Sequence, residues 1–333
     1  MKPFIIAEIG VNHDGNLMKA KTLIDEAIRS GACAVKFQSF SAKRLSSIDT
    51  PKVAYQNTRD VKRSHYEMLK ELELTFNEQK MLFDYSTYKK IEFISTPYSV
   101  EDAIFLNELG VKKFKVASAD IIDIPLHQMI SSYGKLTLIS TGMASKKEIS
   151  EVMKIYQGKN CPVVLLQTTS EYPSPIINAN LSKLNFLKSL NPYAVGYSDH
   201  TKTSICAVTS VGIGATYFEK HFTLKNSDLG PDHYASLEPK EFKDYVNDIE
   251  MAFTSLGNEF PKRTAEEENM AETSRKSLHY AKDMKSGFQL LREDFLLVRP
   301  GTGLPYSFLE SVIYKKLSRD VSKFEIVTKE DFI

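Results

Sequence analysis

The chain has 333 residues, of which 42% are hydrophobic and 26% are charged, a composition ordinary for a globular protein with a complete hydrophobic core. Its 43 Lys and Arg residues balance 42 Asp and Glu residues, which argues against nucleic acid or a membrane surface as the main partner, because both normally require a basic excess. A (β/α)8 barrel takes about 250 residues, so this length leaves room for a second, smaller domain.

The amino terminus and the cysteines predict a cytoplasmic protein. The opening MKPFIIAEIG has a short apolar run that soon reaches Glu8, which predicts a first strand instead of a signal peptide. No uninterrupted apolar stretch approaches the about 18 residues that a membrane span requires. Cys33, Cys161 and Cys206 are too few and too widely spaced for a disulfide framework or a CxxC zinc site. We expect all three to be small buried residues in a reducing cytosol.

Eight short β-rich runs alternate with longer segments of helical periodicity. In chain order, the runs are residues 4–9, 34–39, 92–96, 113–117, 136–141, 163–168, 194–198 and 216–222. Apolar residues at helical spacing in segments such as 17–30 and 100–109 predict crossover helices. This alternation favours an α/β fold with a parallel sheet, and eight units favour closure into a (β/α)8 TIM barrel.

Three further segments define the predicted domain organisation. Residues 41–81, with Pro51, Tyr55 and a cluster of Lys, Arg and His, are longer than one crossover requires, which predicts an elaborated loop over the barrel mouth. A polar loop, KNSDLGPDHYAS, then precedes a predicted helix at 240–256. Short alternating runs cut by Gly and Pro near the carboxyl terminus predict a small β-rich domain. The predicted parts are a barrel at 1–256, a linker at 257–276 and a β-rich domain at 277–333.

Polar side chains gather where the predicted strands end, and in a (β/α)8 barrel these ends carry the chemistry. Lys36 and Lys115 lie within otherwise apolar runs, where an ammonium group without a partner is costly to bury. One such lysine is typical of a structural ion pair with Glu8 or Asp120. Both together favour binding of an anion such as phosphate. The hydroxyl groups predicted to join them belong to Thr96, Ser118, Ser140 and Ser198.

His200 and His221 end two adjacent predicted strands and are expected to face one pocket. Neutral imidazoles are common metal ligands, and two of them without thiolates leave positions open for water and substrate. Each histidine alone is more typical of a hydrogen-bonded structural residue, so the residues leave metal binding and a structural role about equally favoured. His13 is predicted to be a turn residue, and His65 a surface or packing residue; the residues assign no role to His279.

The motifs in this chain resemble those of the sialic acid synthase family. In order, they are IAEIGVNHDG, AVKFQSF, ISTPYS, FKVASAD, ISTGM, EYPSP, GYSDHT, FEKHFTL and GPDHYAS. The tail with VRPGTG resembles that family's antifreeze-like, or SAF, domain. The resemblance extends from about residue 5 to the carboxyl terminus and includes N-acetylneuraminate, legionaminic acid and pseudaminic acid synthases.

The resemblance implies a homodimeric transferase that condenses phosphoenolpyruvate with an open-chain N-acylated hexosamine and water. The sugar is N-acetylmannosamine or a 2,4-diacetamido-trideoxyhexose, and the products are a nine-carbon 2-keto sugar acid and phosphate. His200 and His221 are expected to hold a divalent metal, Mn²⁺ before Mg²⁺ or Co²⁺, and Glu8 to deprotonate the reacting water. Arg299 of the SAF domain is expected to cap the partner's active site. The substrate-binding residues that the resemblance implies are Lys36, Gln38, Thr96, Lys115, Ser118, Asp120, Ser140, Ser170, Tyr172, Ser198, Asp232 and Arg299.

Three positions depart from the family pattern and leave the sugar open. Asp120 stands where Glu is usual, and Gln167 and Ser170 replace residues that are often His or Asn. Two alternatives remain. One is another phosphoenolpyruvate–aldose synthase or a Schiff-base aldolase, for which Lys115 is the best candidate nucleophile. The other is a catalytically silent binding protein that acts through its carboxyl-terminal domain.

Overall fold

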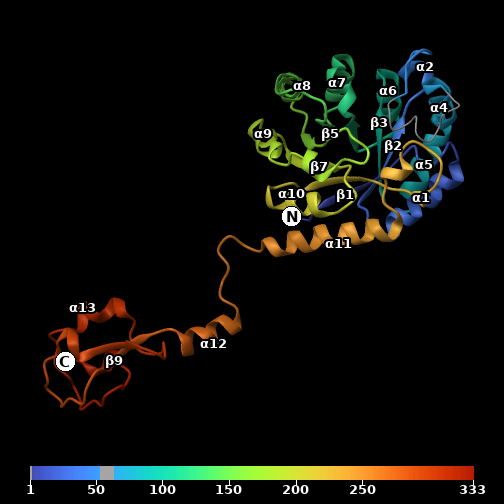
Figure 1. Ribbon diagram of the computed structural model, residues 1–333. Coiled ribbons are helices and arrows are strands. Elements are labelled where there is room, and N and C mark those ends of the chain that lie inside the picture. The colour runs from blue at the N-terminus through green and yellow to red at the C-terminus, as the bar shows by residue number, and fades with distance from the viewer. Residues whose placement is uncertain (1, 53–63) are drawn as a thin grey trace. The chain divides into compact units, whose positions relative to one another are not determined.

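The computed structural model describes residues 2–52 and 64–333. The chain forms two compact units, Met1–Gly257 and Asn258–Ile333 (Figure 1). The first contains the eight-stranded sheet and most of the helices, and the second contains a two-stranded antiparallel sheet.

Eight parallel strands form one sheet in the order β3-β2-β1-β8-β7-β6-β5-β4. Because β3 and β4 also lie against each other, the sheet curves into a nearly closed barrel, which confirms the predicted fold. Each predicted run differs from its strand by at most one residue at either end. The strands are β1 (Phe4–Gly10), β2 (Ala34–Ser39), β3 (Glu92–Pro97), β4 (Lys113–Val116), β5 (Leu136–Ser140), β6 (Val163–Gln167), β7 (Ala194–Asp199) and β8 (Tyr217–His221).

Helices cover the outside of the barrel. Local capping sets where several begin: Thr75 and Glu78 form a capping box at α5, and Ser145 and Glu148 form one at α8. Most of these helices pack an apolar stripe on the sheet, and this layer is the main hydrophobic core, whereas the apolar residues of α2 and α4 form a separate buried cluster. The helices are α1 (Leu17–Arg29), α2 (Ala42–Leu45), α4 (His65–Leu72), α5 (Phe76–Tyr88), α6 (Val100–Leu109), α7 (Ile124–Ser132), α8 (Lys146–Gly158), α9 (Lys183–Ser189), α10 (Ile205–Gly212) and α11 (Pro239–Leu256).

The inside of the barrel changes from apolar to polar along the strands. At the amino-terminal end, residues such as Ile6 and Leu138 pack against one another in a small buried cluster. Two residues later on the same strands, Glu8 and Ser140 line a cavity. Because side chains alternate between the two faces of a strand, these positions share the inner face. The apolar layer therefore closes the barrel below a polar site at its carboxyl-terminal mouth.

Two expectations about this unit need correction. The segment at 41–81 is not a simple loop: it contains α2, α4 and the start of α5, and Met68, Leu69 and Leu72 of α4 are buried. Residues 53–63, with Tyr55, lie outside the described part of the chain. The expectation that all cysteines are buried is wrong for Cys33, which is exposed just before β2, whereas the other two are buried and all three are free thiols.

The carboxyl-terminal unit has a core of its own. The segment predicted as a linker contains α12 (Ala265–Ser274), which begins at a Thr264–Glu267 capping box. Strands β9 (Ser277–Tyr280) and β10 (Phe295–Val298) then pair antiparallel, and α13 (Leu309–Val312) follows. Isolated bridges join other extended segments. The buried residues of this core include Leu278, Tyr280, Leu290, Leu317 and Val327.

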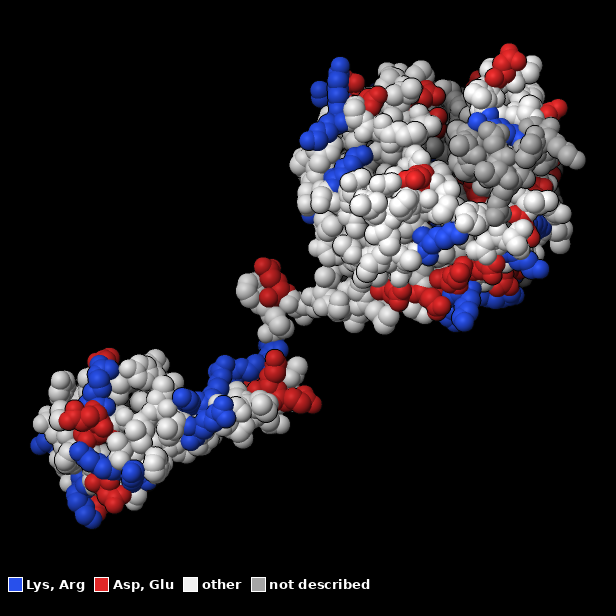
Figure 2. All heavy atoms as spheres, viewed as in Figure 1, with Lys and Arg blue, Asp and Glu red and all other residues white. Residues whose placement is uncertain are grey.

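On the face of the barrel unit in Figure 2, Lys and Arg side chains are interspersed with Asp and Glu, as the balanced composition predicts. Among the described residues, no helix combines the length and apolar character needed to cross a bilayer.

Candidate active site

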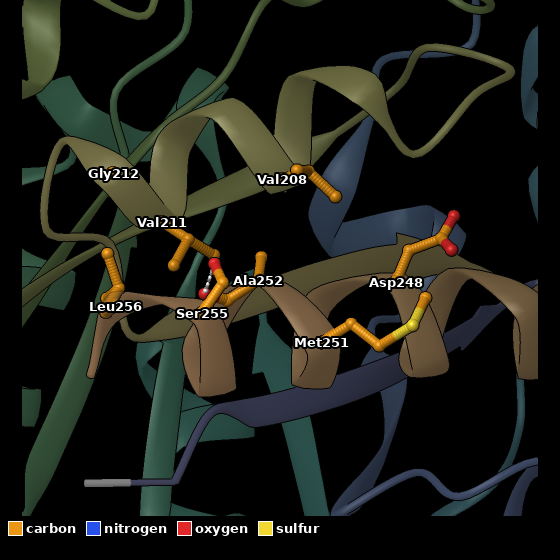
Figure 3. Close-up of a pocket in the computed structure, with 8 residues that line it drawn as sticks. All are labelled: Val208, Val211, Gly212, Asp248, Met251, Ala252, Ser255 and Leu256. Carbon is orange, nitrogen blue, oxygen red and sulfur yellow. Dashed lines mark hydrogen bonds between the residues drawn. The ribbon is translucent and has the colours of Figure 1, made fainter. Parts of the chain in front are cut away.

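A cavity of about 530 Å³ occupies the carboxyl-terminal mouth of the barrel. Every strand, or the segment directly after it, contributes to its wall. The contributors include Glu8, Lys36, Thr96, Lys115, Ser140, Thr168, Ser198 and His221. A second cavity of about 530 Å³ lies between α10 and α11 on the outer helical layer (Figure 3). Its wall is mostly apolar and Asp248 is its charged residue, so the groups suited to catalysis are those at the mouth.

Four charged side chains form a buried cluster at the floor of the mouth. Lys36 Nζ lies 2.7 Å from Glu8 Oε2 and 3.9 Å from Glu219 Oε2. Lys115 Nζ lies 3.8 Å from Glu219 Oε1 and donates to the carbonyl oxygen of Val116 at 3.1 Å. The structural ion pair between Lys36 and Glu8, which the sequence left open as an alternative to anion binding, is therefore present. It faces the cavity, so its ammonium group is also available to a ligand.

Burial shifts the pKa values of this cluster. Loss of hydration raises the pKa of Glu8 to about 7, although Lys36 opposes the shift. Burial also lowers the pKa of Lys115 to about 8, while Glu219 acts in the opposite direction. The two ammonium groups keep the pKa of Glu219 below its ordinary value despite burial. Where Glu8 is protonated, the two lysines outnumber Glu219 and the cluster has excess positive charge, which suits an anionic ligand.

Hydroxyl groups border the ammonium groups. Thr96 Oγ1 accepts a hydrogen bond from Lys36 Nζ at 3.2 Å, and Ser198 Oγ donates to Glu219 Oε1 at 3.0 Å. Ser140 Oγ is buried without a hydrogen-bond partner among the described residues. A buried hydroxyl in this state is costly, and an oxygen-rich ligand would satisfy it. Ser118 Oγ already accepts the Gly142 N–H at 3.1 Å and retains its own proton to donate.

The two predicted metal ligands lie side by side, with ring centroids 5.5 Å apart. His200 Nδ1 donates to the carbonyl oxygen of Thr169 at 2.7 Å, which leaves Nε2 as the unprotonated nitrogen. Burial lowers the pKa of His200 to about 4 and lowers that of His221 well below its ordinary value. Both imidazoles are therefore neutral, the form that binds metals. Tyr172 packs on His200 with a centroid separation of 4.1 Å.

These residues fit a divalent metal ion. His221 Nδ1 is buried and has no hydrogen-bond partner among the described residues. Asp232 Oδ2 lies 3.7 Å from this nitrogen, so a carboxylate lies beside the His221 imidazole. Burial raises the pKa of Asp232 to about 6, and a cation beside it would favour the ionised form. Two imidazoles and one carboxylate leave positions open for water and substrate.

Of the other predicted residues, some line the cavity and others do not. Gln38 and Ser170 line the cavity, whereas Asp120 does not, although burial raises its pKa to about 7. Gln167 is turned away: its amide donates to the carbonyl oxygen of Ala179. Arg299 is exposed on the carboxyl-terminal unit. The sugar-binding roles of Asp120 and Arg299 therefore stay predictions.

Three histidines other than His200 and His221 were considered in the sequence, namely His13, His65 and His279. His13 Nδ1 accepts the Gly15 N–H at 3.0 Å, as in a turn. His65 begins α4 and lines the cavity, and His279 Nδ1 bonds to the carbonyl oxygen of Ser277.

Glu219 was missing from the predicted site, although it lies between the two lysines. The signal was present in the sequence, because Glu219 and His221 are two residues apart on β8 and therefore share a face.

Comparisons with known proteins identify the family of this chain. A model described as the NeuB family matches residues 23–260. An N,N'-diacetyllegionaminic acid synthase of Legionella pneumophila is 39% identical over 97% of this chain and 92% of that protein. A pseudaminic acid synthase of Campylobacter jejuni is 31% identical over 99% of this chain and 97% of that protein. The crystal structure of N-acetylneuraminic acid synthetase from Leptospira borgpetersenii, in complex with citrate, matches with a TM-score of 0.74 and 34% identity, covering 82% of this chain and 91% of that chain.

A parallel eight-stranded barrel with a buried, charged cavity at its carboxyl-terminal mouth is the architecture of a (β/α)8-barrel enzyme, and these matches assign the chain to that class. The family model covers more than half of the chain, and the relatives align over nearly all of it. The chain belongs to the NeuB family. This confirms the resemblance of its barrel motifs, whereas the SAF character of the tail stays a prediction.

Proposed function

We propose that this enzyme is a sialic-acid-type synthase that condenses phosphoenolpyruvate with the open-chain aldehyde of an N-acylated hexosamine. Water is the third reactant, and the products are a nine-carbon 2-keto sugar acid and phosphate. The supporting observation is that two neutral imidazoles share one cavity with the buried Lys36 and Lys115. The names of the relatives, which include legionaminic and pseudaminic acid synthases, point to the same type of reaction.

Phosphoenolpyruvate fits the lysine side of the cavity. Lys36 and Lys115 supply positive charge, and the free hydroxyl of Ser140 supplies a donor for a phosphate or carboxylate oxygen. The same ammonium groups would stabilise the negative charge that grows on the departing phosphate.

His200 and His221, with Asp232 beside them, would hold the divalent ion, for which Mn²⁺ is expected ahead of Mg²⁺ or Co²⁺. When bound, such an ion supplies a Lewis acid for the aldehyde oxygen of the sugar. The Tyr172 ring, tilted against His200 at a centroid separation of 4.1 Å, would limit the rotation of that imidazole.

The addition of water to the phosphoenolpyruvate carbon depends on the Glu8 carboxylate. C3 of phosphoenolpyruvate forms a C–C bond to the aldehyde carbon, and the aldehyde oxygen takes up a proton to become a hydroxyl. Water adds at C2, and Glu8, with its pKa raised to about 7, accepts the proton that this water loses. The C2–O bond to phosphate then breaks, and the C2 hydroxyl passes its proton to the departing phosphate, which leaves the ketone. Incubation with phosphoenolpyruvate, the amino sugar and Mn²⁺ tests the proposal: free phosphate must appear together with a keto acid whose mass equals that of the sugar plus pyruvic acid.

We propose that the preferred sugar is a 2,4-diacetamido-trideoxyhexose. One side of the cavity is apolar, formed by Val11, Leu45, Met68, Leu69 and Leu72. A deoxy methyl group and a second acetyl methyl group can pack there, whereas the additional hydroxyl groups of N-acetylmannosamine would lose hydration. The relative at 39% identity is a synthase of a diacetylated sugar acid.

A sugar panel measures this preference. We expect kcat/KM for the diacetamido sugar to exceed that for N-acetylmannosamine by about 10-fold or more. Leu45→Ser, at a half-buried position, should reduce the ratio, whereas Ile104→Ser on the exposed side of α6 should leave it unchanged. A higher kcat/KM for N-acetylmannosamine would reverse the assignment.

One observation favours a second candidate, a Schiff-base aldolase. Burial lowers the pKa of Lys115 to about 8, as an amine nucleophile requires. Borohydride reduction in the presence of substrate separates the two, because an aldolase would retain a covalent adduct on Lys115 and a synthase would not.

We further propose that the enzyme is a homodimer in which Arg299, on the carboxyl-terminal unit, reaches the partner's barrel. Exposed apolar side chains surround the mouth on the segments that follow the strands, as expected for a surface that another chain covers. They are Ile48, Ile122, Met143, Ile177 and Leu229. Arg299 is exposed, so its guanidinium is accessible to a second chain.

Subunit mixing tests this arrangement. Arg299→Ala and His221→Ala variants should each be inactive alone. Random reassortment gives half heterodimers, each with one intact site, so the mixture should regain about a quarter of wild-type activity. A mixture of inactive variants that regains nothing despite confirmed exchange would show that Arg299 acts within its own subunit, and an Arg299→Ala variant that is active alone would show that Arg299 has no role.

A further inference from the structure

A buried ion pair lies directly behind the two metal-binding histidines. Asp199 precedes His200 at the end of β7, and Lys220 precedes His221 at the end of β8. Since side chains alternate along a strand, the histidines face the cavity while Asp199 and Lys220 face the helices outside. Asp199 and Lys220 are register partners on the two strands, and both side chains are 0% exposed.

Asp199 and Lys220 also hold the backbone of Thr201, the residue that follows His200. Asp199 Oδ1 accepts the Thr201 N–H at 2.8 Å and lies 3.5 Å from Lys220 Nζ. Lys220 Nζ donates to the carbonyl oxygen of Thr201. Thr201 is therefore bound through both of its backbone groups, once by the residue before His200 and once by the residue before His221. On the outer side, the aromatic ring of Tyr245 on α11 covers Lys220 Nζ at 5.5 Å.

Stability alone does not explain this arrangement. Removing an ammonium group and a carboxylate from water is costly, and well-packed apolar residues of similar volume often replace a buried ion pair without loss. The surroundings already supply an apolar layer, because α10 and α11 pack here against the sheet. What an apolar pair could not supply is the directional bond from Lys220 to Thr201, which ties the segment carrying His200 to the strand carrying His221.

We infer that Asp199 and Lys220 are positioning residues that fix the separation and orientation of His200 and His221 and thereby set the affinity for the metal ion. The inference rests on the proposed metal site. Asp199 and Lys220 face away from the cavity and do not contact the substrate, so their replacement is expected to act on the metal through the two imidazoles.

The test compares matched apolar replacements in the full-length enzyme. Asp199→Leu combined with Lys220→Met should keep the wild-type circular dichroism spectrum and melting temperature. Its Kd for Mn²⁺, measured by calorimetry, should rise about 10- to 100-fold, the range for residues that orient metal ligands. The control is Glu92→Leu with Lys113→Met, a pair joined at 2.6 Å at the amino-terminal ends of β3 and β4, which should leave Kd unchanged.

A conservative variant covers the case in which the double replacement does not fold. Asp199→Asn keeps the shape and the acceptor for Thr201 but removes the negative charge, and a smaller rise in Kd is expected. A folded double variant, or Asp199→Asn, that binds Mn²⁺ with the wild-type Kd would overturn the inference while leaving the proposed metal site intact. Failure of the wild-type enzyme to bind any divalent ion would instead refute the metal site and the inference together.

Discussion

Replacement of His221 by alanine is expected to abolish turnover and to remove most of the affinity for a divalent ion. The proposed ligands are the imidazoles of His200 and His221, whose ring centroids are 5.5 Å apart, and the carboxylate of Asp232 beside His221. Losing one of them leaves too few ligands to hold a metal against water. We expect kcat to fall by about 10³-fold or more, because the charge on the aldehyde oxygen would lose its Lewis acid. Phosphate release and calorimetric Mn²⁺ titration measure the two effects.

The matched control is His127→Gln. His127 is also a buried, neutral imidazole, but its Nδ1 bonds to the Tyr156 hydroxyl between α7 and α8 and it does not line the cavity. This variant should lose stability and retain Mn²⁺ binding. The metal assignment would be wrong if His221→Ala were as active as metal-stripped wild-type enzyme resupplied with Mn²⁺.

Glu8→Gln is expected to lower kcat by about 10²- to 10⁴-fold, the usual contribution of a general base. Glutamine keeps the shape of Glu8 and its contact with Gln38 but cannot accept a proton from water. Its effect on KM should be opposite to that of a lost binding residue. Removing a negative charge 2.7 Å from Lys36 frees that ammonium group for phosphate, so KM for phosphoenolpyruvate should fall or stay the same.

The pH profile provides an independent measurement. Glu8 acts as a base only when deprotonated, and burial raises its pKa to about 7. Activity of the wild-type enzyme should therefore rise with pH through about 7 and fall as the pH drops below it. Glu8→Gln should lose this rise, whereas Glu92→Gln, at the amino-terminal end of β3, should keep it. A wild-type rate that does not change between pH 6 and pH 8 would exclude Glu8 as the base.

Local patterns in the sequence determined the barrel and much of the site. Strand runs and crossover helices depend on the spacing of apolar residues within short segments, so their positions follow from neighbouring residues alone. In a barrel of parallel strands, all carboxyl ends meet at one mouth, so Lys36, Lys115, His200 and His221 were predicted together without knowledge of their distances. The helices within 41–81 were missed because Pro51 and the charged cluster are typical of a loop, and the apolar stripe of the eight-residue α4 is too short to outweigh them.

Only the tertiary structure decided which charges meet. Glu8 pairs with Lys36, Glu219 lies between both lysines, and Asp199 faces Lys220 on the outer side of the sheet. The contacts of Glu219 join β8 to β2 and β4, which are distant along the chain and meet only when the barrel closes. The other two join consecutive strands and depend on the register between them. The pKa of Glu8 follows from the same contacts, because hydration is lost only when the barrel closes around the carboxylate.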